Sequence, residues 1–114
     1  MKRKFRLTRN RDFSRVRQNG KTFAHPLLVL ITHPNESTIT RVGIITSRML
    51  GNAVQRNRTR RQVKAIMQEL FQHIPSGWDL VILTRKKIVD ASSHEIKTVL
   101  KEIFIQADLW KENG

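Results

Sequence analysis

The sequence predicts an α/β fold of the α+β type, a single helix–sheet sandwich with the element order α-β-β(-β)-α-β-α. Two apolar runs rich in strand-forming residues, Leu27–Thr32 and Trp78–Thr84, are bounded by proline or glycine. Two later stretches repeat apolar residues at helical spacing. A chain of 114 residues is long enough for one domain and too short for two. We therefore expect one domain over residues 1–114, with flexible ends at 1–6 and 111–114.

The first predicted helix begins near Thr8 or Asn10, either of which can cap it, and ends at Gly20. Phe13 and Val16 lie on one face of this helix. Arginines flank that face: Arg9, Arg11, Arg15 and Arg17.

Two strands come next. Leu27–Thr32 follows a proline, and after a polar turn Ile39–Thr46 should pair with it as a hairpin. Trp78–Thr84 is the last predicted strand. A helix between the second and third strands would join them in parallel, and the general rule predicts a right-handed crossover.

The second helix should run from Asn52, a plausible cap, to His73, before Pro75-Ser76-Gly77. Its apolar stripe is Val63, Ile66, Met67, Leu70, Phe71 and Ile74. Ser92 and Glu95 form a capping box for the last helix. Its stripe is Ile96, Val99, Leu100, Ile103 and Ala107.

The charge is strongly unbalanced. Lys and Arg number 22 against nine Asp and Glu, a net charge of +13. Such an excess destabilises a compact chain by self-repulsion, so it indicates a polyanionic partner, with nucleic acid the leading candidate. An anionic membrane surface is the second candidate, but the apolar residues here are needed for a core.

The sequence defines the cellular compartment less closely than it defines the class of partner. The chain has no cysteine, which excludes disulfides and thiolate metal sites and fits a reducing, cytoplasmic environment. The basic N-terminus lacks the apolar segment of a secretory signal. Its charge also fits an organellar transit peptide, so an organellar origin stays open. No apolar run reaches the roughly 18 residues of a membrane span.

The segment 51–64, GNAVQRNRTRRQVK, holds four arginines and one lysine at the start of the second helix. At 100° per residue, Arg56, Arg60 and Lys64 lie near one line, with Asn57 and Arg61 beside them. The first turns should either overhang the sheet or lean into a groove beside it. Arginine pairs well with phosphate because its planar fork donates two parallel hydrogen bonds. The competing interpretation is a solvated basic face, but no acidic residue pairs with these arginines before Glu69.

This segment resembles the signature of the bacterial ribonuclease P protein subunit. That family shows a Gly-Asn-Ala-Val step, then Arg-Asn-Arg and two more basic residues, which match Gly51–Val54 and Arg56–Arg61. The resemblance extends in register from about residue 5 to residue 110. Its other matching steps are Arg6-Leu7, Asp12-Phe13, Arg41-Val42-Gly43, Asp79-Leu80-Val81 and Arg85.

The resemblance implies a ribosomal-protein-like fold with a left-handed crossover. It also implies a non-catalytic protein that assists a catalytic RNA, with Mg²⁺ held mainly by that RNA and no obligatory protein partner. The residues expected to bind the RNA subunit are Arg48, Asn52, Arg56, Asn57, Arg58, Arg60, Arg61 and Lys64. The single-stranded 5′ leader of precursor tRNA should lie between the first helix and the sheet. The residues expected to bind it are Arg9, Phe13, Arg17, Ile31 and Arg85.

Two positions depart from the family pattern. Arg17 stands where many members have a phenylalanine, and Ile31 where some have a tyrosine, which weakens the stacking surface that single-stranded RNA needs. Phe13 could equally be a core residue that holds the helix to the sheet, and both roles are compatible. Phe5 and Phe23 fit the core better than a contact.

A protein active site is not expected. The sequence shows no carboxylate pair, no clustered histidines and no Ser/His/Asp arrangement. Two alternatives remain: a ribosomal or architectural RNA-binding protein without a leader cleft, and a protein-only nuclease using a base such as His25.

Overall fold

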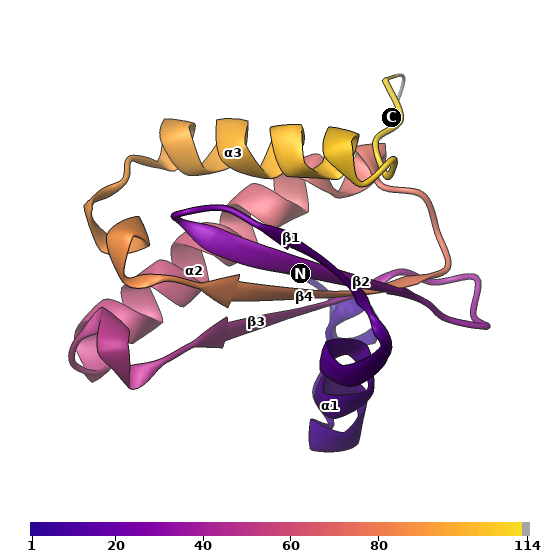
Figure 1. Cartoon of the computed structure of the whole chain (residues 1–114), viewed down its shortest axis with the longest axis horizontal. Helices are drawn as coiled ribbons and strands as arrows, with labels where there is room; N and C mark the ends of the chain where they lie inside the picture. Colours follow the sequence, from indigo (N-terminus) through magenta and orange to yellow (C-terminus); the bar gives the residue numbers. More distant parts are fainter. Residues whose placement is uncertain (113–114) are drawn as a thin grey trace.

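The computed structural model describes residues 1–112 and contains the predicted sandwich, a four-stranded mixed sheet with α1 on one face and α2 and α3 on the other (Figure 1). The helices are α1 (Asn10–Asn19), α2 (Ala53–Leu70) and α3 (Ser93–Gln106). The strands are β1 (Lys21–Ala24), β2 (Leu28–Pro34), β3 (Arg41–Thr46) and β4 (Trp78–Thr84).

The order of strands in the sheet is β1-β2-β4-β3. Strand β4 lies between β2 and β3, antiparallel to β2 and parallel to β3, so the predicted hairpin between the second and third strands is wrong. The hairpin partner of β2 is the short strand β1, which the apolar pattern did not reveal. In the turn between them, His25 N–H donates to the Leu28 carbonyl at 2.9 Å, and His25 Nδ1 accepts from Leu27 N–H at 3.0 Å.

The step from β3 through α2 to β4 joins parallel neighbours. Both strands run to the left in Figure 1, with α2 behind them and β4 above β3, which makes the crossover left-handed. The right-handed crossover predicted from the general rule is therefore wrong, and the hand implied by the family resemblance is confirmed.

Side chains cap the two longer helices as predicted. Asn52 Oδ1 accepts from Gln55 N–H at 3.0 Å, and Ser92 Oγ accepts from Glu95 N–H at 3.0 Å. Helix α2 ends at Leu70, and a 3-10 turn over Phe71–His73 continues to the predicted end.

Helix α1 begins differently. The residue at its N-cap position is Arg9, whose side chain makes no capping hydrogen bond, so neither Thr8 nor Asn10 caps the helix. Gly20 follows the helix with φ −81°, an ordinary value. It is required for a close approach instead, because a Cβ there would lie 2.4 Å from the Val16 carbonyl oxygen.

Apolar clusters lie on both faces of the sheet. The larger joins the sheet to α2 and α3 and contains the predicted stripes together with the fully buried Phe104. The smaller lies under α1: Leu7, Val16, Ile31 and Val81. Beyond it Val29, Ile45 and Leu83 are only partly buried, because the ten residues of α1 cover only part of that face.

The ends of the described chain contact the fold. The Met1 ammonium donates to Gln68 Oε1 at 3.1 Å, and Lys111 N–H donates to the His73 carbonyl at 2.7 Å. The flexibility expected for residues 1–6 and 111–114 stays a prediction, and residues 113–114 lie outside the described range. None of the helices in residues 1–112 combines the length and apolarity that crossing a membrane requires.

Candidate nucleic-acid interface

The positive charge is concentrated in one part of the chain. Residues 1–64 hold sixteen of the 22 basic residues and only two of the nine acidic ones. This stretch spans the N-terminal segment, α1, the strands β1 to β3 and the start of α2, and fourteen of its sixteen basic residues lie in the N-terminal segment, α1, β3 and the start of α2. Helix α3, by contrast, carries two lysines and two glutamates. A polyanion would therefore meet the side formed by α1, β3 and the start of α2.

The residues predicted to bind the RNA subunit gather around the start of α2. Arg48, Asn52, Asn57, Arg58 and Arg61 are exposed, and Arg56, Arg60 and Lys64 are half-buried. The inward-facing residue of these first turns is Thr59, only 3% exposed, which sequence reasoning did not single out.

Arg60 shows that the first turns lean against the sheet. Its Nη2 donates to Thr46 Oγ1 at 2.6 Å, at the end of β3. Its Nη1 donates to Asn57 Oδ1 at 3.0 Å, one turn earlier on α2. Of the two arrangements expected from the sequence, the structure therefore shows the second, in which the first turns of α2 lean into a groove beside the sheet.

The residues predicted to bind the leader differ more widely in their exposure to solvent. Arg9, Arg17 and Arg85 are exposed and Phe13 is half-buried. Ile31 is only 5% exposed, because it faces α1 from β2 and packs in the smaller cluster. The structure thus places Ile31 in the core, not at a surface that a nucleotide reaches.

Phe13 lies directly against the backbone of β3. A Cβ built on Gly43 would lie 2.4 Å from Phe13 Cε1 and 2.5 Å from Cζ, so the ring occupies the space that a side chain would fill. Because the residue is only half-buried, the ring both packs on the sheet and keeps an open side.

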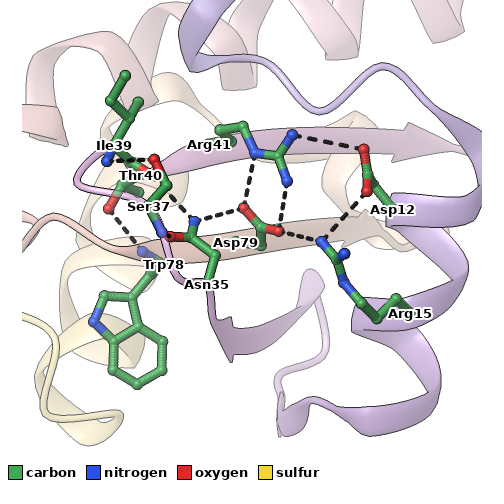
Figure 2. Close-up of polar contacts among 9 residues, drawn as sticks. All are labelled: Asp12, Arg15, Asn35, Ser37, Ile39, Thr40, Arg41, Trp78 and Asp79. Atoms are coloured by element: carbon green, nitrogen blue, oxygen red, sulfur yellow. Dashed lines mark hydrogen bonds and ion pairs between the residues drawn. The ribbon is translucent and has the colours of Figure 1, made fainter.

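A buried carboxylate joins α1 to the sheet (Figure 2). Asp79 of β4 is fully buried, and its Oδ1 accepts from Arg41 Nε at 3.0 Å and Asn35 Nδ2 at 2.8 Å. Its Oδ2 accepts from Arg41 Nη2 at 2.9 Å and Arg15 Nη2 at 2.8 Å. Asp12 of α1 completes the cluster, 3.3 Å from Arg15 and 3.6 Å from Arg41.

The partners of Asp79 keep it ionised. Burial alone would raise the pKa of its carboxyl group, but hydrogen bonds from Arg41 and Asn35, the charge of Arg41 and the hydrogen bond from Arg15 outweigh burial and leave the pKa below its usual value. Asp12 and Asp79 share Arg15 and Arg41 as partners, an arrangement that the sequence did not reveal. Two arginines neutralise them, so the arrangement holds α1 in place and is not set up for proton transfer.

Two of the hollows that adjoin these surfaces lie beside β4 and β3. One of about 700 Å³ lies where β4 ends, lined by Arg85, Lys86 and Lys87 with His25 and Met49. Of these lining residues, only Arg85 is among those predicted to bind RNA. The other, about 170 Å³, lies at the edge of β3 between Phe13 and Arg60. Within residues 1–112, no three histidine, aspartate or glutamate side chains gather where they could hold a metal ion.

Comparison with known proteins identifies the family. The family model for ribonuclease P matches residues 1–108. The chain belongs to the ribonuclease P protein family. The ribonuclease P protein component of Herpetosiphon aurantiacus is 38% identical over 112 residues, which cover 98% of this chain and 91% of that protein. The same component of Chloroflexus aurantiacus is 37% identical over 110 residues, covering 96% and 82%.

Solved structures of the ribonuclease P family agree with the fold. The RNase P protein of Staphylococcus aureus superimposes with a TM-score of 0.85 at 29% identity, covering 94% of this chain and 98% of that one. The RNase P protein of Thermotoga maritima superimposes with a TM-score of 0.81 at 28% identity, covering 89% and 96%. The family resemblance expected from the 51–64 segment is thus confirmed over almost the whole length.

Proposed function

We propose that this chain is the protein component of a ribonuclease P and helps a catalytic RNA remove the 5′ leader of precursor tRNA. The observation that carries the proposal is the arginine-rich start of α2, presented at the surface by a member of this family. Its guanidinium groups suit the phosphates of a folded RNA. The alternative of a ribosomal or architectural protein is not favoured, since the relatives and structural neighbours are ribonuclease P proteins.

The RNA subunit would bind along the start of α2. Arg56, Arg58, Arg60 and Arg61 with Lys64 would contact phosphates, and Arg48 extends this surface from the preceding turn. Asn52 contributes mainly by capping the helix, because its side-chain oxygen is already hydrogen-bonded.

The leader would bind on the α1 face of the sheet. Single-stranded RNA requires stacking surfaces beside a basic rim. Phe13 offers an open ring, and Val29, Ile45 and Leu83 form a partly exposed apolar floor beyond it. Arg9 and Arg17 of the α1 region and Arg85 after β4 would supply the rim.

Cleavage would depend on the RNA subunit and its Mg²⁺. We expect the pure protein to leave precursor tRNA intact, and to lower the salt and Mg²⁺ concentrations that the cognate RNA requires, because a net charge of +13 screens phosphate repulsion. Multiple-turnover cleavage at low Mg²⁺, with and without each component, measures this. Cleavage by RNA-free protein would indicate a protein nuclease. No effect of the protein on the RNA at physiological salt would favour a purely architectural role.

Phe13→Ala should reduce the affinity of the reconstituted holoenzyme for precursor tRNA more than for leaderless tRNA. Loss of stacking on one base is worth about 1–3 kcal/mol, and we expect the lower half because Arg17 stands where the family pattern often has an aromatic residue. The measurement is the ratio of affinities for long-leader and leaderless substrates.

Phe23→Ala is the matched control, since Phe23 is also half-buried but packs against the larger cluster on the opposite face. It should lower thermal stability without changing the ratio. If Phe13→Ala lowers stability and leaves the ratio intact, Phe13 is only a core residue and the leader lies elsewhere.

A further inference from the structure

The smaller hollow lies where the two proposed RNA surfaces meet. Strand β3 is an outer strand of the sheet, and the N-terminal segment covers part of its free edge through Leu7 N–H, which donates to the Val42 carbonyl at 2.9 Å. Beside this hydrogen bond the hollow of about 170 Å³ reaches Phe13 on the α1 side and Arg60 on the α2 side.

The lining of this hollow is positively charged. Arg6, Arg60 and Lys64 contribute to it, and no acidic side chain does. Arg6 Nε is buried and has no hydrogen-bond partner among the described residues. A buried donor without an acceptor is costly, so turning the Arg6 guanidinium toward an oxygen-rich anion in the hollow would remove a defect of the free protein.

Arg60 is already oriented for such a ligand. Thr46 and Asn57 together engage two of its five N–H donors and leave three available. Its guanidinium is therefore fixed between α2 and β3 before any ligand arrives, which reduces the entropy lost on binding.

We propose that this hollow binds one RNA phosphodiester, with Arg6, Arg60 and Lys64 as its ligands and Thr46 and Asn57 as positioning residues for Arg60. The inference rests on the proposed function. A volume of about 170 Å³ is below the roughly 300–1,000 Å³ of ordinary small-molecule sites, so it suits a phosphate group and not a whole nucleotide. Asn57 then acts through Arg60 and does not itself contact RNA.

The first experiment counts phosphates. The Arg6→Gln/Arg60→Gln/Lys64→Gln variant should reduce the slope of log K against log[salt] for RNA binding by about 0.7–0.9, the contribution of a single neutralised phosphate. The Lys97→Gln/Lys101→Gln/Lys111→Gln variant removes equal charge from the α3 side and the C-terminal segment and should leave the slope unchanged. An unchanged slope in the first variant, with its circular dichroism retained, would overturn the site. A reduction about three times larger would show that the three side chains bind three separate phosphates and would overturn the single-phosphate site.

Two binding assays distinguish the source of the phosphate. If the slope for the triple variant changes when it binds the isolated RNA subunit, the phosphate belongs to that RNA. A change only when the assembled holoenzyme binds precursor tRNA assigns it to the substrate. Wild-type holoenzyme that fails to cleave would refute the proposed function itself, whereas normal cleavage with an unaffected slope in the triple variant would refute only this site.

The second experiment tests positioning. Thr46→Val keeps the β-branched shape but removes the hydroxyl group, and should weaken RNA binding about two- to tenfold. Thr46→Ser should restore binding. In an Arg60→Gln background, Thr46→Val should have no further effect. A full effect in that background would show that Thr46 acts independently of Arg60.

Discussion

Replacing Arg56, Arg60 and Arg61 together by alanine should weaken binding to the cognate RNA by roughly 10³-fold and leave the domain folded. Hydrogen bonds to charged groups contribute about 1.5–3 kcal/mol each, and we expect values near the lower limit because these side chains are exposed or half-buried. The domain should stay folded because the buried stripe of α2 starts at Val63, apart from Thr59. The slope of log K against log[salt] should fall by about 0.7–0.9 for each phosphate that the variant no longer neutralises.

Binding titrations over a range of salt concentrations, together with circular dichroism, measure both effects. Alanine at Lys97, Lys101 and Lys111 provides the control, because it removes the same charge outside the proposed interface. If the two variants lose affinity equally, the arginines of α2 belong to a general basic surface with no particular role.

The elements of this fold could be predicted from the sequence, but their order in the sheet could not. Apolar runs and helical spacing identify which segments are strands and helices. Strand β4 takes the central position because it is apolar on both faces, with five of its seven residues buried. Nothing in a linear pattern says that it inserts between β2 and β3. Strand β1 was missed because four residues with mostly exposed side chains leave no apolar signal.

The handedness of the crossover is a different kind of failure. The general preference for right-handed connections concerns how a twisted strand leads into a helix, and it applies to most sheets. This chain is an exception, and only the specific match at Gly51–Arg61 indicated it in advance. Family resemblance therefore carried information that local physics did not.

The part of the candidate interface that comes from one continuous segment could be predicted from the sequence. The arginines of α2 are close together in sequence, so composition and helical geometry located them. The cluster around Asp79 draws its members from α1, β3, β4 and the loop after β2, and spacing along the chain does not reveal it. One signal was available: an aspartate in an otherwise apolar strand must find partners, because an unpaired buried charge is expensive.

Asp79→Asn should lower the free energy of unfolding at pH 7 by about 2–3 kcal/mol. Breaking a buried ion pair by removing one partner costs about 3–5 kcal/mol. A smaller effect is expected here because the side chains of Arg15 and Arg41, 44% and 30% exposed, can recover some hydration. The exposed Asp90→Asn is the matched control and should change stability little.

The lowered pKa of Asp79 makes its contribution depend on pH in a defined direction. A carboxyl group whose pKa is lower in the folded than in the unfolded state stabilises the fold fully above the unfolded value, about 3.9 for Asp. That contribution disappears as the pH falls through the lower folded value. The stability gap between wild type and Asp79→Asn should therefore be largest near neutral pH and narrow below about pH 4, as measured by urea unfolding. A gap independent of pH would mean that the variant disturbs packing and not the ionic interactions. Since the same ion pairs hold α1 against β3 and β4, breaking them should also reduce the preference for long-leader substrate that we expect Phe13 to provide.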